Sequence, residues 1–101
     1  MSYWIELTHT ETEPREVEDA CLNVTYNYGE ILRRVLGDKS VRALYGMTGE
    51  ESIPLLEEAM SKLGEDESAD YWEATEGNVK ASLGTLLDMA KEFPASVWRG
   101  D

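Results

Sequence analysis

The stretch ACLNVTYNYGEILRRVLG, residues 20–37, combines the clearest apolar periodicity of the chain with its most unusual polar side chains. Apolar residues recur along it at steps of three and four, which is the spacing of a buried stripe on an α-helix. The members of this stripe are Cys21, Val24, Tyr28, Ile31, Leu32 and Val35. The spacing predicts a helix over residues 18–36 that stops at Gly37, because glycine readily adopts the left-handed conformation that ends helices. Local propensity opposes this helix, since β-branched residues, asparagines and a central Gly29 are poor helix formers.

The opposite side of this expected helix is polar. Its members are Asn23, Asn27, Glu30 and Arg34, with Tyr26 at the border. Amide and phenol groups donate and accept hydrogen bonds in fixed directions, whereas an ordinary solvated helix face carries mainly Glu and Lys. Two interpretations follow: a ligand-binding face, or a face that meets water or a second subunit.

The two ends of the chain are expected to meet in a small sheet. Residues 2–8 alternate apolar and polar side chains and are rich in strand formers, which predicts one β-strand. Residues 10–14 are polar and contain a proline, so we expect a turn there, after which residues 15–17 could form a short partner strand. Val97 and Trp98 form an apolar pair that needs a packing partner, and the first strand is the expected one.

A second helix is expected in the middle of the chain, after a helical turn at residues 41–46. Thr48 and Glu51 have the spacing of a capping box. A helix that begins at Gly49 would, however, place Pro54 beyond the first turn, where the missing N–H group breaks the hydrogen-bond ladder. We therefore expect the regular helix over residues 52–63.

A third helix is expected over residues 76–93, where apolar residues again keep a 3.6-residue period. Thr75 can cap its start, and Pro94 prevents its continuation. Before it lies an acidic loop, residues 65–70, followed by the aromatic pair Tyr71 and Trp72, which we expect to hold this loop on the core.

These elements predict one domain over residues 1–101, of the α+β class and dominated by helix. Three helices would form its core, with a short N-terminal strand or hairpin across one side. Six side chains are expected to be buried where the helices meet: Ile31, Val35, Leu56, Met60, Leu83 and Leu87.

The chain is strongly acidic, with 21 acidic and nine basic residues and a net charge of −12. A globule this negative would be repelled by a nucleic-acid duplex, but it would be attracted to a basic surface of another protein. Four bases form a local basic island: Arg33, Arg34, Lys39 and Arg42. No apolar stretch approaches the ~20 residues that span a bilayer, and a single cysteine forms no disulfide within the chain, so we expect a cytoplasmic protein.

Residue types that most catalytic and metal sites need are scarce. His9 is the only histidine and Cys21 the only cysteine, which excludes the usual zinc sites and hydrolytic triads. Paired carboxylates are frequent, but in so acidic a chain solvated charge explains them better than an acid and base pair. We therefore expect a protein that is not an enzyme and that needs no metal or cofactor.

Two short segments, residues 47–49 and 75–78, place a hydroxyl group and a glycine at an expected helix start. Helix N-termini attract anions and glycine lets a ligand approach the backbone, although an ordinary helix cap is the alternative for each. Together with amides, aromatic rings and arginines, these segments could form a pocket for a small nucleotide-derived ligand. The candidate ligand-binding residues are Asn23, Tyr26, Asn27, Arg33, Arg34, Arg42, Tyr45, Thr48, Trp72, Thr75 and Asn78.

Four segments form distinctive motifs: NVTYNYG (residues 23–29), LYGMTGEESIP (44–54), DYWEATEGNVK (70–80) and VWRGD (97–101). In these motifs the chain resembles a family of small, acidic, uncharacterised proteins of phages and prophages. The resemblance covers most of residues 1–101 and implies a setting in the host-cell cytoplasm, but no particular activity.

The expected function is therefore a non-enzymatic counter-defence protein that binds and sequesters a small nucleotide-derived signalling ligand. The alternative is an acidic inhibitor of the DNA-mimic, anti-CRISPR or anti-restriction type. Such an inhibitor would block the basic nucleic-acid-binding surface of a host defence protein.

Overall fold

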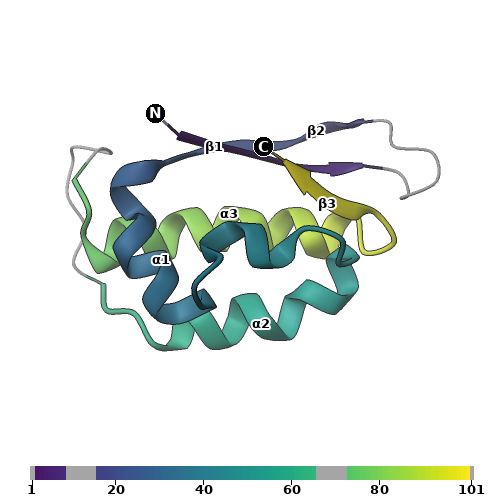
Figure 1. Cartoon of the computed structure of the whole chain (residues 1–101). Helices are drawn as coiled ribbons and strands as arrows, with labels where there is room; N and C mark the ends of the chain where they lie inside the picture. Colours follow the sequence, from purple (N-terminus) through teal and green to yellow (C-terminus); the bar gives the residue numbers. More distant parts are fainter. Residues whose placement is uncertain (1, 9–15, 66–72, 101) are drawn as a thin grey trace.

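The computed structural model describes residues 2–8, 16–65 and 73–100. A three-stranded antiparallel sheet forms one layer, and the helices lie together on one of its faces (Figure 1). The elements are β1 (Ser2–Thr8), β2 (Glu16–Thr25), the 3-10 helix η1 (Tyr26–Tyr28), α1 (Gly29–Leu36), the 3-10 helix η2 (Ser40–Leu44), α2 (Gly49–Ser61), α3 (Glu76–Glu92) and β3 (Val97–Gly100). The predicted class, α+β and dominated by helix, is confirmed.

The predicted helix over residues 18–36 is wrong in its first half. Residues 16–25 form strand β2, and only the eight residues of α1 are α-helical. Local propensity prevails here, because the β-branched residues Val24 and Thr25 favour an extended backbone and Asn23 is a poor helix former. The apolar pattern fits both structures, since Val24 lies in the core as a strand residue and Tyr28, Leu32 and Val35 lie there as helix residues. Gly37 ends α1 with a positive φ of 95°, as expected.

The sheet has the order β2-β1-β3. β1 agrees with its predicted range, but its partner β2 is ten residues long and not the short strand expected over residues 15–17. Ile5 lies opposite Leu22, and Leu7 lies opposite Trp98. The predicted packing of Val97 and Trp98 beside the first strand is therefore confirmed.

Helix α2 begins at Gly49 and not near Ser52 as expected. The capping box is complete, because Thr48 Oγ1 accepts from the backbone N–H of Glu51 and the Glu51 side chain accepts from that of Thr48. Pro54 lies inside the helix but on its exposed side, where water can reach the carbonyl group that proline leaves unpaired. A favourable cap thus outweighs one lost hydrogen bond.

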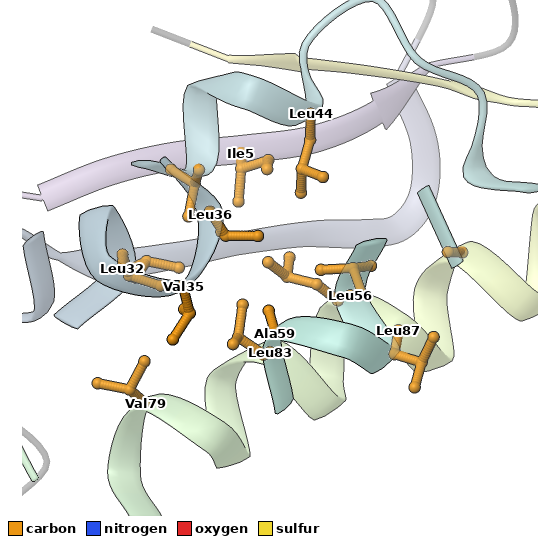
Figure 2. Close-up of a cluster of buried hydrophobic side chains, with 14 of the residues drawn as sticks. Ile5, Leu32, Val35, Leu36, Leu44, Leu56, Ala59, Val79, Leu83 and Leu87 are labelled. Carbon is orange, nitrogen blue, oxygen red and sulfur yellow. The ribbon is translucent and has the colours of Figure 1, made fainter. Parts of the chain in front are cut away.

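Helix α3 matches its predicted range closely, with Thr75 as its N-cap. The core lies between α1, α2, α3 and the inner face of the sheet, where Ile5, Leu32, Leu56 and Leu83 meet (Figure 2). Of the six residues expected in the core, four are buried and two, Ile31 and Met60, are partly buried at its margin. The expectations for residues 10–15, 66–70 and the aromatic pair at 71–72 lie outside the described residues.

Candidate functional site

The start of α2, one of the two expected anion-binding segments, has its N–H groups already bonded within the chain. Gly49 N donates to Ser96 O at 2.8 Å, and Glu50 N donates to Pro94 O at 2.9 Å. Glu51 N donates to Thr48 Oγ1 at 3.1 Å. Since all three N–H groups of the first turn are used, Thr48 acts here as a structural cap.

Gly49 is required by the close approach of α2 to the end of α3. A Cβ atom at this position would lie 2.7 Å from Phe93 O and 2.9 Å from Ala90 O, and both atoms belong to the backbone. The motif glycine thus serves helix packing and not the approach of a ligand.

Segments 44–54 and 97–100 dock on each other through hydrogen bonds. Trp98 N donates to Met47 O at 2.9 Å, and Gly46 N donates to Trp98 O at 3.0 Å. The buried Trp98 Nε1 donates to Ser52 Oγ at 2.8 Å, and Ser52 Oγ donates to Gly49 O at 2.7 Å. Much of these two sequence motifs is therefore explained by the fold.

Tyr45 lies in the same region, half-buried at the end of the sheet. Its hydroxyl group donates to Trp4 O at 3.5 Å, which is a long hydrogen bond. A Cβ atom at Gly100 would overlap Tyr45 Oη and Trp4 O, so only glycine fits beside the tyrosine ring.

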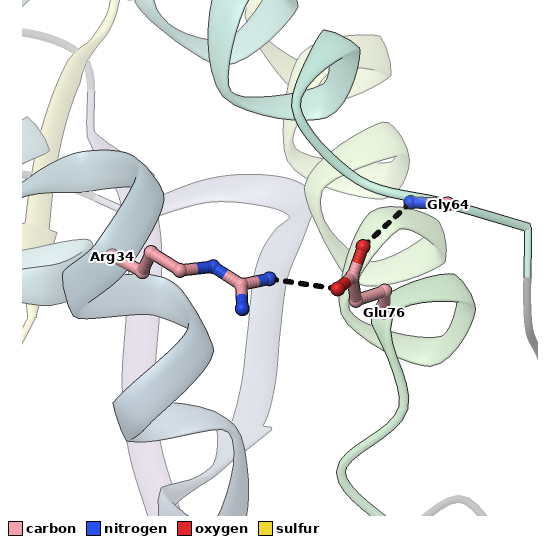
Figure 3. Close-up of polar contacts among 3 residues, drawn as sticks. All are labelled: Arg34, Gly64 and Glu76. Atoms are coloured by element: carbon pink, nitrogen blue, oxygen red, sulfur yellow. Dashed lines mark hydrogen bonds and ion pairs between the residues drawn. The ribbon is translucent and has the colours of Figure 1, made fainter.

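A second group of candidate residues meets at the start of α3. Thr75 Oγ1 accepts from Asn78 N at 3.1 Å, and the nearly buried Asn78 donates through Nδ2 to Glu73 O at 3.0 Å. The neighbouring Glu76 accepts from Gly64 N at 2.9 Å and from Arg34 Nη2 at 3.0 Å (Figure 3). These contacts connect α1, the chain after α2 and the first turn of α3.

The environment of Glu76 lowers the pKa of its carboxyl group. The larger cause is the hydrogen bond from the Gly64 backbone, and the hydrogen bond and positive charge of Arg34 add to it. Both partners stabilise the ionised form. Arg34 is thus already paired with an acid of this chain.

The remaining candidates lie on the surface. Asn23, Tyr26 and Asn27 are exposed at the junction of β2 and η1, where Asn27 N donates to Thr25 Oγ1 at 3.2 Å. Arg33 and Arg42 are exposed on α1 and η2. Trp72 lies outside the described residues.

The structure does not bring all of these residues into one small pocket. Thr48 and Thr75 lie beyond opposite ends of α2, whose 13 residues span about 20 Å. Arg34, Thr75 and Asn78 are brought together around Glu76, whereas Tyr45 and Thr48 lie at the far end beside β3. No nucleotide-sized ligand could contact both helix starts at once.

Two further surfaces lie outside the set of candidate ligand-binding residues. The first is a row of exposed carboxylates on the outer side of α2, formed by Glu50, Glu51, Glu57 and Glu58. The second is the outer face of the sheet, which carries Trp4, 43% exposed. Each could have been found from the sequence, the first from acids at helical spacing and the second from the alternation of residues 2–8.

Within residues 2–8, 16–65 and 73–100, no group of three histidine, cysteine or acidic residues could hold a metal ion. No helix found there has the length and apolar character needed to cross a membrane. Comparison of the chain with protein-family models, with curated proteins and with solved structures found no match.

Proposed function

We propose that this protein is a non-enzymatic inhibitor that docks its acidic helical face on a basic, nucleic-acid-binding surface of another protein. The observation that carries the proposal is the row of carboxylates along α2. Glu50, Glu51, Glu57 and Glu58 are all exposed residues of α2. This helix lies on the side of the helical layer that is away from the sheet (Figure 1). Only Glu58 among them forms an ion pair with a described base, at 3.5 Å from Lys62 Nζ.

The density of these acids supports attraction to a surface that binds phosphates. They form two pairs, Glu50 with Glu51 and Glu57 with Glu58, about 10 Å apart along the helix axis, so four negative charges lie within about 12 Å of one helix. Exposed Asp88 and Glu92 on α3 add negative charge to the helical layer. The net charge of −12 would accelerate association with a basic partner.

The resemblance to phage and prophage proteins suggests what the partner is. A phage protein that binds a nucleic-acid-binding surface in a host cell would most usefully block a defence nuclease or a repressor. The acidic charge disfavours nucleic acid itself as the ligand.

The test is a pair of variants that each remove two negative charges. Glu57→Gln with Glu58→Gln neutralises the α2 row, and Glu30→Gln with Asp38→Asn neutralises exposed acids on and after α1. We expect the first pair to weaken inhibition of the target nuclease on the order of tenfold at physiological salt, from ~0.7 kcal/mol per charge. The control pair should change it by less than about twofold. Equal effects of both pairs, or none from the first, would argue against the acidic face.

A second candidate function has one specific observation in its favour. Tyr26 is 37% exposed, and Asn23 and Asn27, close to it in the sequence, are exposed residues as well, a combination that could stack on and hydrogen-bond a nucleobase. A nucleotide-derived ligand sequestered there should be retained in native mass spectrometry of protein from cells with an active defence. Binding measured by calorimetry should disappear in a variant with Tyr26→Ala and Asn27→Ala, and no retained ligand would end this candidate.

A further inference from the structure

Left-handed backbone conformations gather around the 3-10 helix η2. Within residues 2–8, 16–65 and 73–100, three residues have a positive φ: Gly37 at 95°, Ser40 at 56° and Gly46 at 91°. Gly37 precedes η2, Ser40 is its first residue, and Gly46 follows its end. The segment of residues 38–45, which we call the flap, therefore lies between two left-handed glycines.

Ser40 is the strained residue of this set. In the left-handed conformation its Cβ atom lies close to the following carbonyl oxygen, a steric cost that glycine does not have. Ser40 is also only 2% exposed, and among the described residues its Oγ atom has no hydrogen-bond partner. Both costs fall on the closed flap, and both are relieved when Ser40 can rotate and reach water.

The backbone hydrogen bonds of the flap are local. Ser40 N donates to Gly37 O at 2.9 Å, Arg42 N donates to Lys39 O at 3.1 Å, and Tyr45 N donates to Arg42 O at 3.2 Å. Such bonds hold the flap in shape without joining it to the sheet or to α2 and α3.

Apolar packing holds the flap on the core. Val41 and Leu44 are fully buried, and Leu44 belongs to the same cluster as Ile5 and Leu36 (Figure 2). A segment that is attached mainly by two apolar side chains has a low cost of local opening.

The chain on both sides of the flap is firmly bonded. Before it, Gly37 N donates to Arg33 O at 3.0 Å at the end of α1. After it, Gly46 N donates to Trp98 O at 3.0 Å, and Trp98 N donates to Met47 O at 2.9 Å. Movement of the flap would therefore be confined to the two glycine positions.

We propose that residues 38–45 form a hinged flap, which opens as a unit about Gly37 and Gly46 while the sheet, α2 and α3 stay folded. Lys39 and Arg42 belong to the flap, whereas Arg33 and Arg34 belong to α1. Opening therefore changes how the four bases of the basic island lie relative to one another. The flap is separate from the carboxylates of α2 and does not depend on the proposed function.

The test is native-state hydrogen exchange of the whole chain at low urea concentrations, measured residue by residue by NMR. The amides of Arg42 and Tyr45, which are bonded within the flap, should have protection factors at least about tenfold lower than amides at the centre of α3. Their protection should also depend less on urea, because opening of the flap exposes less surface than unfolding of the whole chain. Equal protection with equal urea dependence would overturn the proposal.

Val79→Ala separates opening of the flap from unfolding of the whole chain. Val79 is fully buried near the start of α3 and lies away from Leu44 in the core (Figure 2). Its truncation should lower protection at the centre of α3 by at least about tenfold. Protection of Arg42 and Tyr45 should stay within about twofold of the wild type, since the flap opens without α3. A fall of the same size in the flap as in α3 would overturn the proposal.

Ser40→Gly tests the strain at the hinge. Glycine adopts the left-handed conformation without steric cost and has no hydroxyl group to leave unpaired, so protection in the flap should rise by at least about threefold. Ser61→Gly, the same substitution at an exposed position of α2, is the matched control and should not raise it. A Ser40→Gly variant whose flap is protected no better than that of the wild type would overturn the proposal.

Discussion

At the scale of single residues, we expect replacement by alanine to have opposite effects on stability at two helical glycines, Gly49 and Gly84. Gly49→Ala forces a Cβ atom against Phe93 O and Ala90 O, backbone atoms that cannot yield without separating α2 from α3, so we expect a loss of about 1–3 kcal/mol. Gly84→Ala places its Cβ 3.4 Å from the flexible end of Met60, so it should stabilise α3 by about 0.5–1 kcal/mol. Urea unfolding of both variants measures the difference. Equal changes, in either direction, would mean that the two helices do not approach as closely as described.

At the scale of elements, the bonds of Glu76 predict how stability depends on pH. Its pKa is lower in the folded state than the ordinary value of 4.5, so its stabilising effect is complete above that value and is lost as pH falls through the folded pKa. Glu76→Gln should therefore lower the unfolding temperature at neutral pH, and the difference from the wild type should shrink as the solution becomes more acidic. Arg34→Gln should lower the unfolding temperature at neutral pH by less than Glu76→Gln does. The hydrogen bond from Gly64, which is the larger cause of the pKa shift, remains in this variant. A Glu76→Gln effect that is constant from neutral to acidic pH would contradict this role.

The elements also show what the sequence could predict. The ranges of β1 and α3 and the Thr75 cap followed from patterns within each segment. The error at residues 18–25 arose because Val24 and Tyr28 fit both a helical stripe and a strand that continues into a helix. Only the pairing of β2 with β1 separates these two structures, and that pairing is a contact between distant residues.

At the scale of the whole molecule, the candidate site also depends on contacts between residues that are distant in the sequence, which local patterns do not predict. Thr48 and Gly49 have the sequence of an anion-binding helix start, but the N–H groups there are used by carbonyl groups of residues 94 and 96. No local pattern reveals a partner more than 40 residues away. The acidic face could be predicted more directly, because exposed acids at helical spacing depend only on the helix that carries them.

The inhibitor proposal for the whole molecule is tested most directly by competition with DNA for the target nuclease. We expect duplex DNA to displace the protein from the nuclease in a competitive manner, and the affinity of the complex to fall as salt concentration rises. A ternary complex of protein, nuclease and DNA, with an affinity that does not depend on salt, would contradict binding through the carboxylates of α2.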